Sequence, residues 1–269
     1  MVMSKQNLAP NDVEIGLYLS GSRVTDEDVL GQHSLFYGTV QIPSKKRFNA
    51  YVKAVSPRQI FAEVFCSLIG RSLNLPIPLT IPVIAKGESL GISAKTVMCV
   101  ASLDCQSVPV GRAVRVEAVI DLLQRWKHNR TAIVFDELIA NSDRHLRNVL
   151  IGSDGKLWLI DHEEALGDPL TNTHRRITNY LLKYLSQDMG RFELRRSATL
   201  LKEASFPTSN LDLDSHAEKS LPHACQVSES HIHHVIEFIR ERILHLPGLI
   251  EDGLGIGQHH LNLSKPHTP

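Results

Sequence analysis

Residues 135–167 read FDELIANSDRHLRNVLIGSDGKLWLIDHEEALG. Apolar residues at helical spacing come first and predict a helix that ends near Asn141, followed by the polar run Ser142–Asp143–Arg144–His145. Two short apolar runs, VLI and LWLI, then flank Asp154–Gly155, a pattern typical of a β-hairpin. Asn148 opens the first strand and Asp161 closes the second, so we expect these two side chains to lie side by side.

Three oxygen-bearing side chains of this hairpin region point to chemistry on phosphates. The oxygens of Asn148 and Asp161 suit Mg²⁺, which takes few protein ligands and leaves positions for phosphates and water. Asp143 lies five residues before Asn148 in the loop leading into the same cleft, where a carboxylate can accept a proton from an attacking hydroxyl. Taken singly, Asp143 is explained equally well as a helix cap and Asp161 as a turn residue.

The order and spacing of Asp143, Asn148 and Asp161 resemble the catalytic Asp, metal-binding Asn and metal-binding Asp of protein kinases. The run Asp143–Arg144–His145 before Asn148 is similar to the DRH-x-x-N motif that phosphatidylinositol 3/4-kinases share with the bacterial HipA-like kinases. The small size, and the passage from YVKAV into a helix ending in LNLPIP, look most like HipA-like kinases. The resemblance covers about residues 31–167.

Upstream residues supply the other parts that this resemblance implies. Lys53, in the strand YVKAV, would hold the α- and β-phosphates of ATP and pair with a glutamate on the following helix. Glu63 is the only acidic residue between Pro57 and Leu75, and it flanks the apolar stripe of that helix. Residues 94–105 fall where the family's lobe-connecting strand and hinge would hold the adenine.

The sequence also departs from the protein-kinase pattern at two places. No G-x-G-x-x-G precedes Lys53, so the resemblance assigns a short phosphate loop to Gln32, His33 and Ser34, with Gly21–Ser22 as another option. Asp161 is followed by His162–Glu163 instead of Phe–Gly.

The resemblance implies an active kinase that uses ATP and Mg²⁺ to phosphorylate Ser or Thr of a protein. Asp143 would be the catalytic base, with Lys53 and Glu63 as its partners in catalysis, and Arg144 and His145 would brace the loop. A bacterial toxin or stress-response role beside an antitoxin-like partner is implied in the same way. The alternatives are a non-enzymatic pseudokinase that binds a partner, and a lipid or small-molecule kinase on the same fold.

The resemblance implies an α+β, two-lobed, protein-kinase-like fold, and hydrophobic periodicity predicts its helices and strands. Residues 1–104 would form a small antiparallel sheet with one helix, residues 105–253 a mainly helical lobe with the catalytic hairpin, and residues 254–269 a poorly ordered tail. Expected strands occupy the hairpin 34–55 and the runs 79–85 and 95–101, and the helix between them spans 58–75 and is amphipathic. Further on, we expect helices around 116–123, 133–139, 177–204 and 232–246, a long surface loop over 205–230, and a helix stop at Pro247–Gly248.

Composition sets broader limits. The 269 residues are 42% hydrophobic and 22% charged, an ordinary globular mixture that argues against a disordered chain, a collagen or a coiled coil. Because Lys+Arg and Asp+Glu both number 29, no overall positive field favours nucleic acid as a direct partner. No apolar run approaches the roughly 20 residues that cross a bilayer, the N-terminal residues lack a signal-peptide core, and four scattered cysteines indicate free thiols. We therefore expect a cytoplasmic protein that does not bind membranes.

A histidine-rich segment gives a competing hypothesis. Zn²⁺ binding would use His223, Cys225, His231, His233 and His234. Their spacing fits no standard zinc finger, and His231 precedes an amphipathic helix, which favours surface positions instead.

Overall fold

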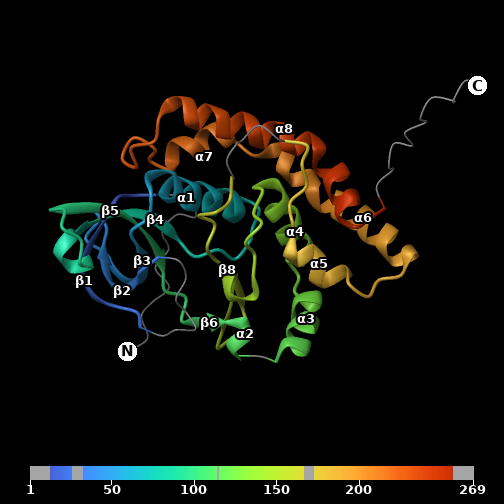
Figure 1. The fold of residues 1–269 in the computed structure, drawn as a ribbon, viewed down its shortest axis with the longest axis horizontal. Helices are drawn as coiled ribbons and strands as arrows, with labels where there is room; N and C mark the ends of the chain where they lie inside the picture. Colours follow the sequence, from blue (N-terminus) through green and yellow to red (C-terminus); the bar gives the residue numbers. More distant parts are fainter. Residues whose placement is uncertain (1–12, 26–32, 114, 167–172, 257–269) are drawn as a thin grey trace, which may run out of the picture.

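The computed structural model describes residues 13–25, 33–113, 115–166 and 173–256. The chain is a mixed α and β protein: five strands with one long helix come first, and a mostly helical part follows (Figure 1). The expected combination of helices and strands is therefore confirmed. No helix within the described ranges is long and apolar enough to cross a membrane.

The first part is a closed barrel of β1 (Gly16–Arg23), β2 (Leu35–Gln41), β3 (Arg47–Lys53), β5 (Thr96–Leu103) and β4 (Thr80–Lys86), in that order around the barrel. The pairings along this order are antiparallel, but β1 and β4 close the barrel in parallel, at Gly16↔Val83 and Leu17↔Ile84. The expectation of a purely antiparallel sheet was therefore wrong at the closure. Gly16 permits this close approach, since a Cβ there would lie 3.0 Å from Cγ1 of Val83 in β4.

The predicted hairpin 34–55 is confirmed as β2 and β3, which pair from Leu35↔Lys53 to Gln41↔Arg47. This register puts Lys53 at the end of its strand, where the chain leaves the barrel for the helix. The predicted strands at 79–85 and 95–101 are confirmed as β4 and β5, joined through the short 3-10 helix η1 (Gly87–Leu90).

Helix α1 (Pro57–Ser72) begins at Ser56, whose hydroxyl accepts from Gln59 N in a capping box. The expected amphipathic stripe was wrong, because every residue from 60 to 70 is buried. The helix contacts the barrel through β4 and β5, and it contacts α7 (Leu213–Lys219) on another side. It ends before the prolines, where Asn74 adopts φ 60°, a left-handed conformation that stops helices.

The second part combines helices with a small antiparallel sheet. The sheet has the order β6-β7-β8, with β7 and β8 forming the predicted hairpin around Asp154–Gly155. The remaining bounds are β6 (Ser107–Pro109), α2 (Val110–Ala113), α3 (Val116–Arg125), α4 (Asn129–Leu138), η2 (Leu146–Asn148), β7 (Val149–Gly152), β8 (Leu157–Leu159), α5 (Tyr180–Ser186), α6 (Arg191–Ser205), η3 (Phe206–Asn210) and α8 (Glu229–Gly253).

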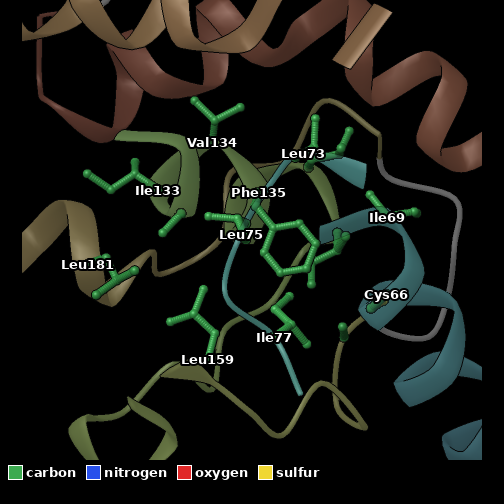
Figure 2. Packing of buried hydrophobic residues seen from close by; sticks show 14 of the residues in the cluster. Cys66, Ile69, Leu73, Leu75, Ile77, Ile133, Val134, Phe135, Leu159 and Leu181 are labelled. Atoms are coloured by element: carbon green, nitrogen blue, oxygen red, sulfur yellow. The ribbon is translucent and has the colours of Figure 1, made fainter. Parts of the chain in front are cut away.

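One hydrophobic cluster joins α1 to the helices of the second part (Figure 2). Phe135 of α4 lies at its centre, and its side chain faces residues from α1, from the segment after α1 and from β8. The labelled members are Cys66, Ile69, Leu73, Leu75, Ile77, Ile133, Val134, Phe135, Leu159 and Leu181. Because α1 and α4 share this core, it fixes the position of the barrel's helix relative to the hairpin.

Three expectations about the C-terminal third were wrong. The helical run 177–204 is two helices, α5 and α6, separated before Gly190, which serves as the N-cap of α6. The expected loop 205–230 contains α7, whose start is capped by Asp212 and whose Leu213 and Ala217 are buried. Helix α8 does not stop at Pro247 but continues to Gly253.

Burial explains why α8 continues through Pro247. A proline removes one helix hydrogen bond and crowds the preceding turn. Leu246, Leu249 and Ile250 are buried on either side of it, so their packing outweighs that cost. Of the expected tail, Leu254 is buried and Ile256 packs on the main core, while residues 257–269 lie outside the described residues.

Candidate active site

A pocket of about 850 Å³ is lined by residues of both the barrel and the hairpin region. The two sources lie far apart in the sequence, since β3 and β5 belong to the barrel while β6, η2 and β7 follow it. Its lining includes all five residues predicted for catalysis and metal binding, which are Lys53, Glu63, Asp143, Asn148 and Asp161.

The predicted phosphate loop is found there only in part. His33 lines the pocket, whereas Ser34 is exposed and outside the described lining, and Gln32 lies outside the described residues. The alternative at Gly21–Ser22 belongs to strand β1, where Gly21 faces Gly38 across the β1–β2 ladder. A Cβ on Gly21 would lie 2.3 Å from Tyr37 O, so this glycine serves close strand packing.

One wall of the pocket is apolar. The barrel strands and the hairpin region both contribute aromatic or aliphatic side chains to it; they are Leu35, Tyr37, Tyr51, Val100, Leu103, Leu150 and Ile160. Ser102, Leu103 and Cys105, from the predicted adenine-binding segment 94–105, are part of the lining. A pocket with an apolar wall and a few convergent polar groups suits a flat ring carrying a charged tail.

The polar end of the pocket centres on Lys53. Its Nζ lies 2.8 Å from Asp161 Oδ1 and 3.4 Å from Glu163 Oε1. Burial opposes the positive charge, but the carboxylates of Asp161 and Glu163 outweigh burial and hold the pKa of Lys53 above its usual range. The ammonium therefore stays charged where an anionic ligand would enter.

Glu63 lines the same pocket but bonds elsewhere. Its carboxylate accepts a hydrogen bond from the backbone N–H of His162, and Glu63 Oε1 lies 3.4 Å from His162 Nδ1. Within the described residues, the ion-pair partners of Lys53 are Asp161 and Glu163, so the predicted Lys53–Glu63 pair is not formed in this state. Burial alone would raise the pKa of Glu63, but His162 and Lys53 hold it below its usual range.

Sequence reasoning missed the part played by Glu163. Its side chain is 9% exposed, and its Oε2 is buried without a hydrogen-bond partner. Burial raises the pKa of Glu163 to about 7, the nearby carboxylates of Asp161 and Glu63 act in the same direction, and Lys53 opposes them. The available signal was the pair of acidic residues, Glu163 and Glu164, that follows Asp161 and His162 in the sequence. We call Lys53, Glu63, Asp161, His162 and Glu163 the pocket cluster.

A second charged group lies beneath the loop that carries Asp143. Arg144 is fully buried, and its Nε and Nη2 donate to the carboxylate of Asp136 at 3.0–3.3 Å. Its Nη1 donates to the backbone carbonyls of Asn148 and Ile160, the residues at the two ends of the hairpin. Asn141 Nδ2 also donates to Asp136, at 3.1 Å. This bracing cluster, Asp136, Asn141 and Arg144, holds the loop and the hairpin together.

The loop geometry directs Asp143 toward the pocket. Its backbone N–H donates to Asn141 Oδ1 at 3.0 Å, and its own carbonyl accepts from Asn148 Nδ2 at 2.7 Å. The carboxylate is 44% exposed, lies 3.0 Å from His145 Nε2, and accepts from Asn148 Nδ2 at 3.2 Å. His145 packs against the Tyr180 ring, with centroids 4.6 Å apart. Asp143 is thus held in place but open to a ligand.

The residues proposed for Mg²⁺ fit that ion. Both recorded side-chain hydrogen bonds of Asn148 use its amide nitrogen, which leaves the amide oxygen as the ligand atom. Asp161 has φ 66°, a left-handed conformation that is uncommon outside glycine and recurs at functional sites. Ile160 N donates to Asn148 O at 3.1 Å, so the two ligand positions are neighbours, as the hairpin predicted. Amide and carboxylate oxygens form the hard donor set that Mg²⁺ prefers.

Among the described residues, one group gathers three metal-ligating side chains, and it consists of His33, Glu163 and Glu164. The histidine-rich segment does not form such a group: Cys225 is buried in a hydrophobic cluster, and His231 packs against Phe61. The four cysteines are free thiols, as expected.

Comparison with known proteins adds no assignment. No family model matches the chain, and no curated protein matches it. A function is therefore inferred from the geometry of the pocket and from the motif residues that line it.

Proposed function

We propose that this protein is an ATP- and Mg²⁺-dependent phosphotransferase of the HipA-like type, on a two-lobed protein-kinase-like fold, that phosphorylates Ser or Thr of a protein. The observation that supports it is that Lys53, Glu63, Asp143, Asn148 and Asp161 line a single pocket. They come from a strand, a helix, a loop and the two ends of a hairpin, and they occur in the order of the kinase parts.

The pocket cluster and the apolar wall would bind the nucleotide. The adenine would lie against Tyr51, Val100 and Leu103, and the phosphates would meet the Lys53 ammonium. Entry of the phosphates would replace the contacts of Lys53 with Asp161 and Glu163. Lys53 would then be free to take up its predicted partner, Glu63.

Asn148 and Asp161 would hold the Mg²⁺ of the nucleotide. When bound, this ion supplies positive charge that offsets the charge developing on the phosphoryl oxygens. The bracing cluster keeps the two ligand positions at a fixed separation, because Arg144 bonds the carbonyls at both ends of the hairpin.

Asp143 would orient and deprotonate the acceptor. The acceptor oxygen forms a bond to the γ-phosphorus while the bond from that phosphorus to the ADP oxygen breaks, and the hydroxyl proton passes to the Asp143 carboxylate. Hydrogen bonds from Asn148 and the contact with His145 fix the direction of this carboxylate.

The resemblance to HipA-like kinases also bears on the cellular role. We propose a cytoplasmic bacterial kinase of the toxin or stress-response kind, with an antitoxin-like protein partner. The proposal is tested against two alternatives. One is a pseudokinase that binds nucleotide without transferring phosphate, and the other is a kinase that acts on lipids or small molecules.

The test is phosphate transfer from γ-labelled ATP with Mg²⁺ to lysate proteins. Asp143→Asn should lower turnover by about 10²–10⁴, the usual contribution of a general base, with nearly unchanged ATP affinity by calorimetry. Asp154→Asn is the matched control, since Asp154 lies in the exposed β7–β8 turn. No transfer by the unmodified protein would identify a pseudokinase, and label confined to lipids would reject a protein acceptor. Equal transfer by both Asp143 forms would remove this residue from the mechanism.

A further inference from the structure

Three side chains that commonly bind metal ions meet at the pocket, and the function proposed so far gives none of them an ion to hold. They are His33, Glu163 and Glu164, called here the three-ligand group. Each offers one ligand atom, and these atoms lie within 4.8 Å of one another. All three residues line the pocket. His33 precedes β2, whereas the two glutamates follow β8, so only the tertiary structure assembles the group.

Glu163 supplies an independent indication that a ligand belongs here. Its side chain is 9% exposed, and its Oε2 is buried without a hydrogen-bond partner among the described residues. Its Oε1 lies 3.9 Å from His33 Nε2, so the carboxylate faces the histidine. A buried acceptor without a partner lowers stability, and a bound cation would remove that penalty.

The amide of Gln59 already contacts two of the three ligand atoms. Its Oε1 accepts from Ser56 N and Ser56 Oγ at the cap of α1, which directs its Nε2 the other way. Gln59 Nε2 donates to Glu164 Oε1 at 2.9 Å and lies 3.5 Å from His33 Nε2. Because an amide nitrogen only donates, His33 Nε2 is the accepting atom, which is the form of imidazole that binds a metal ion.

The distances within the group suit one small ion. Two ligands of one Zn²⁺ lie at most about 4.3 Å apart, since Zn–N and Zn–O bonds are about 2.0–2.2 Å long. The 3.9 Å between His33 Nε2 and Glu163 Oε1 meets this limit. Glu164 is exposed, so rotation of its side chain can close the remaining gap of about half an ångström.

The local charge also favours a dication. The carboxylates of Asp161 and Glu163 share one ammonium, that of Lys53. Glu164 adds a third carboxylate, and the donor that it meets among the described residues is the neutral amide of Gln59. Two positive charges would balance what Lys53 leaves uncompensated. Lys53 would keep its closer partner, Asp161 at 2.8 Å, while the ion takes Glu163.

We propose that the three-ligand group binds a transition-metal dication, for which Zn²⁺ is the best match. An imidazole nitrogen combined with carboxylates suits Zn²⁺, whereas Mg²⁺ prefers oxygen ligands alone. The proposed Mg²⁺ ligands, Asn148 and Asp161, are a different set. Three protein ligands leave a fourth position, which would take water or an oxygen of an anion in the pocket. This inference goes beyond phosphate transfer and does not depend on it.

The experiment is a calorimetric titration of the full chain with Zn²⁺, after treatment with a chelator and in excess Mg²⁺ without nucleotide. One equivalent should bind. His33→Ala and Glu164→Gln should each weaken binding at least roughly ten-fold, because even the outer partners of metal ligands contribute about 10–100-fold. Glu164→Gln changes an exposed side chain, so it tests the site even where His33→Ala fails to fold. His234→Ala is the matched control, since His234 is an exposed histidine of α8 outside the group.

Three results would overturn the inference. They are absence of Zn²⁺ binding in excess Mg²⁺, unchanged affinity in Glu164→Gln, and an equal loss in His234→Ala, which would assign the ion to surface histidines. Asn148→Ala should keep the affinity for Zn²⁺. A loss confined to Asn148→Ala would move the ion to the Mg²⁺ ligands and contradict a separate site. Failure of phosphate transfer would reject the kinase function and leave this site standing, because its binding is measured without nucleotide.

Discussion

The bracing cluster and the pocket cluster both bury charged groups beside the β7–β8 hairpin, but they differ in how those groups are satisfied. In the bracing cluster, all three nitrogens of the Arg144 guanidinium donate, and both oxygens of Asp136 accept. In the pocket cluster, Glu163 Oε2 and His162 Nε2 are buried without partners.

The balance of charge differs in the same way. The bracing cluster pairs one carboxylate, that of Asp136, with one guanidinium, that of Arg144. The pocket cluster holds the three carboxylates of Glu63, Asp161 and Glu163, and its single ammonium, that of Lys53, pairs with the last two. A buried network that is fully satisfied stabilises one conformation, and a network with surplus negative charge is prepared for an incoming cation. We infer that the bracing cluster serves the fold and the pocket cluster serves a ligand.

The largest effect should follow from breaking the bracing cluster. Asp136→Asn keeps the shape of the side chain but leaves the buried Arg144 guanidinium without a counter-charge. Losing one partner of a buried ion pair costs about 3–5 kcal/mol of unfolding free energy. Denaturant unfolding should measure this loss.

The control for that experiment is Asp121→Asn, in the exposed Asp121–Arg125 pair of α3. Exposed pairs contribute about 0–1 kcal/mol, so this variant should unfold close to the unmodified protein. Equal destabilisation by the two variants would mean that the bracing cluster has no special structural role.

A smaller effect, on ligand binding, should follow from neutralising the cation of the pocket cluster. Lys53→Met should weaken binding of ATP with Mg²⁺ by roughly ten- to a hundred-fold, because a hydrogen bond to a charged group is worth about 1.5–3 kcal/mol. Calorimetric titration measures the affinity. Lys46→Met, in the exposed β2–β3 turn, should bind as the unmodified protein does. Unchanged affinity in Lys53→Met would mean that Lys53 is a simple strand residue.

The smallest effect should come from removing one of the surplus carboxylates. Glu163→Gln keeps the shape of the side chain and removes a buried charge whose pKa is already raised to about 7. Lys53 retains its closer partner, Asp161, at 2.8 Å. The unfolding free energy should therefore change by no more than about 1 kcal/mol, with a gain as the favoured direction. A loss as large as that of Asp136→Asn would abolish the distinction between the two clusters.

Several features were decided by the sequence alone, because they depend on neighbouring residues. The β2–β3 hairpin, the β7–β8 hairpin around Asp154–Gly155 and helix α4 follow from local periodicity and turn chemistry. The closeness of Asn148 and the residues beside Asp161 also follows, since a hairpin of this length must bring its two ends together. The fixed spacing within the DRHLRN run is likewise enough to make Asp143 a candidate for catalysis.

Other features were decided only by the tertiary structure, because they depend on contacts between distant residues. Helix α8 continues through Pro247 since the residues around it are buried, and β1 depends on its pairing with β2 and, at Gly16 and Leu17, with β4. The partners of Lys53 lie 108 and 110 residues further along the chain, as the numbering of Asp161 and Glu163 gives. Lys53 pairs with these two residues and not with Glu63 because of how α1 packs against the hairpin. No local sequence pattern encodes that packing.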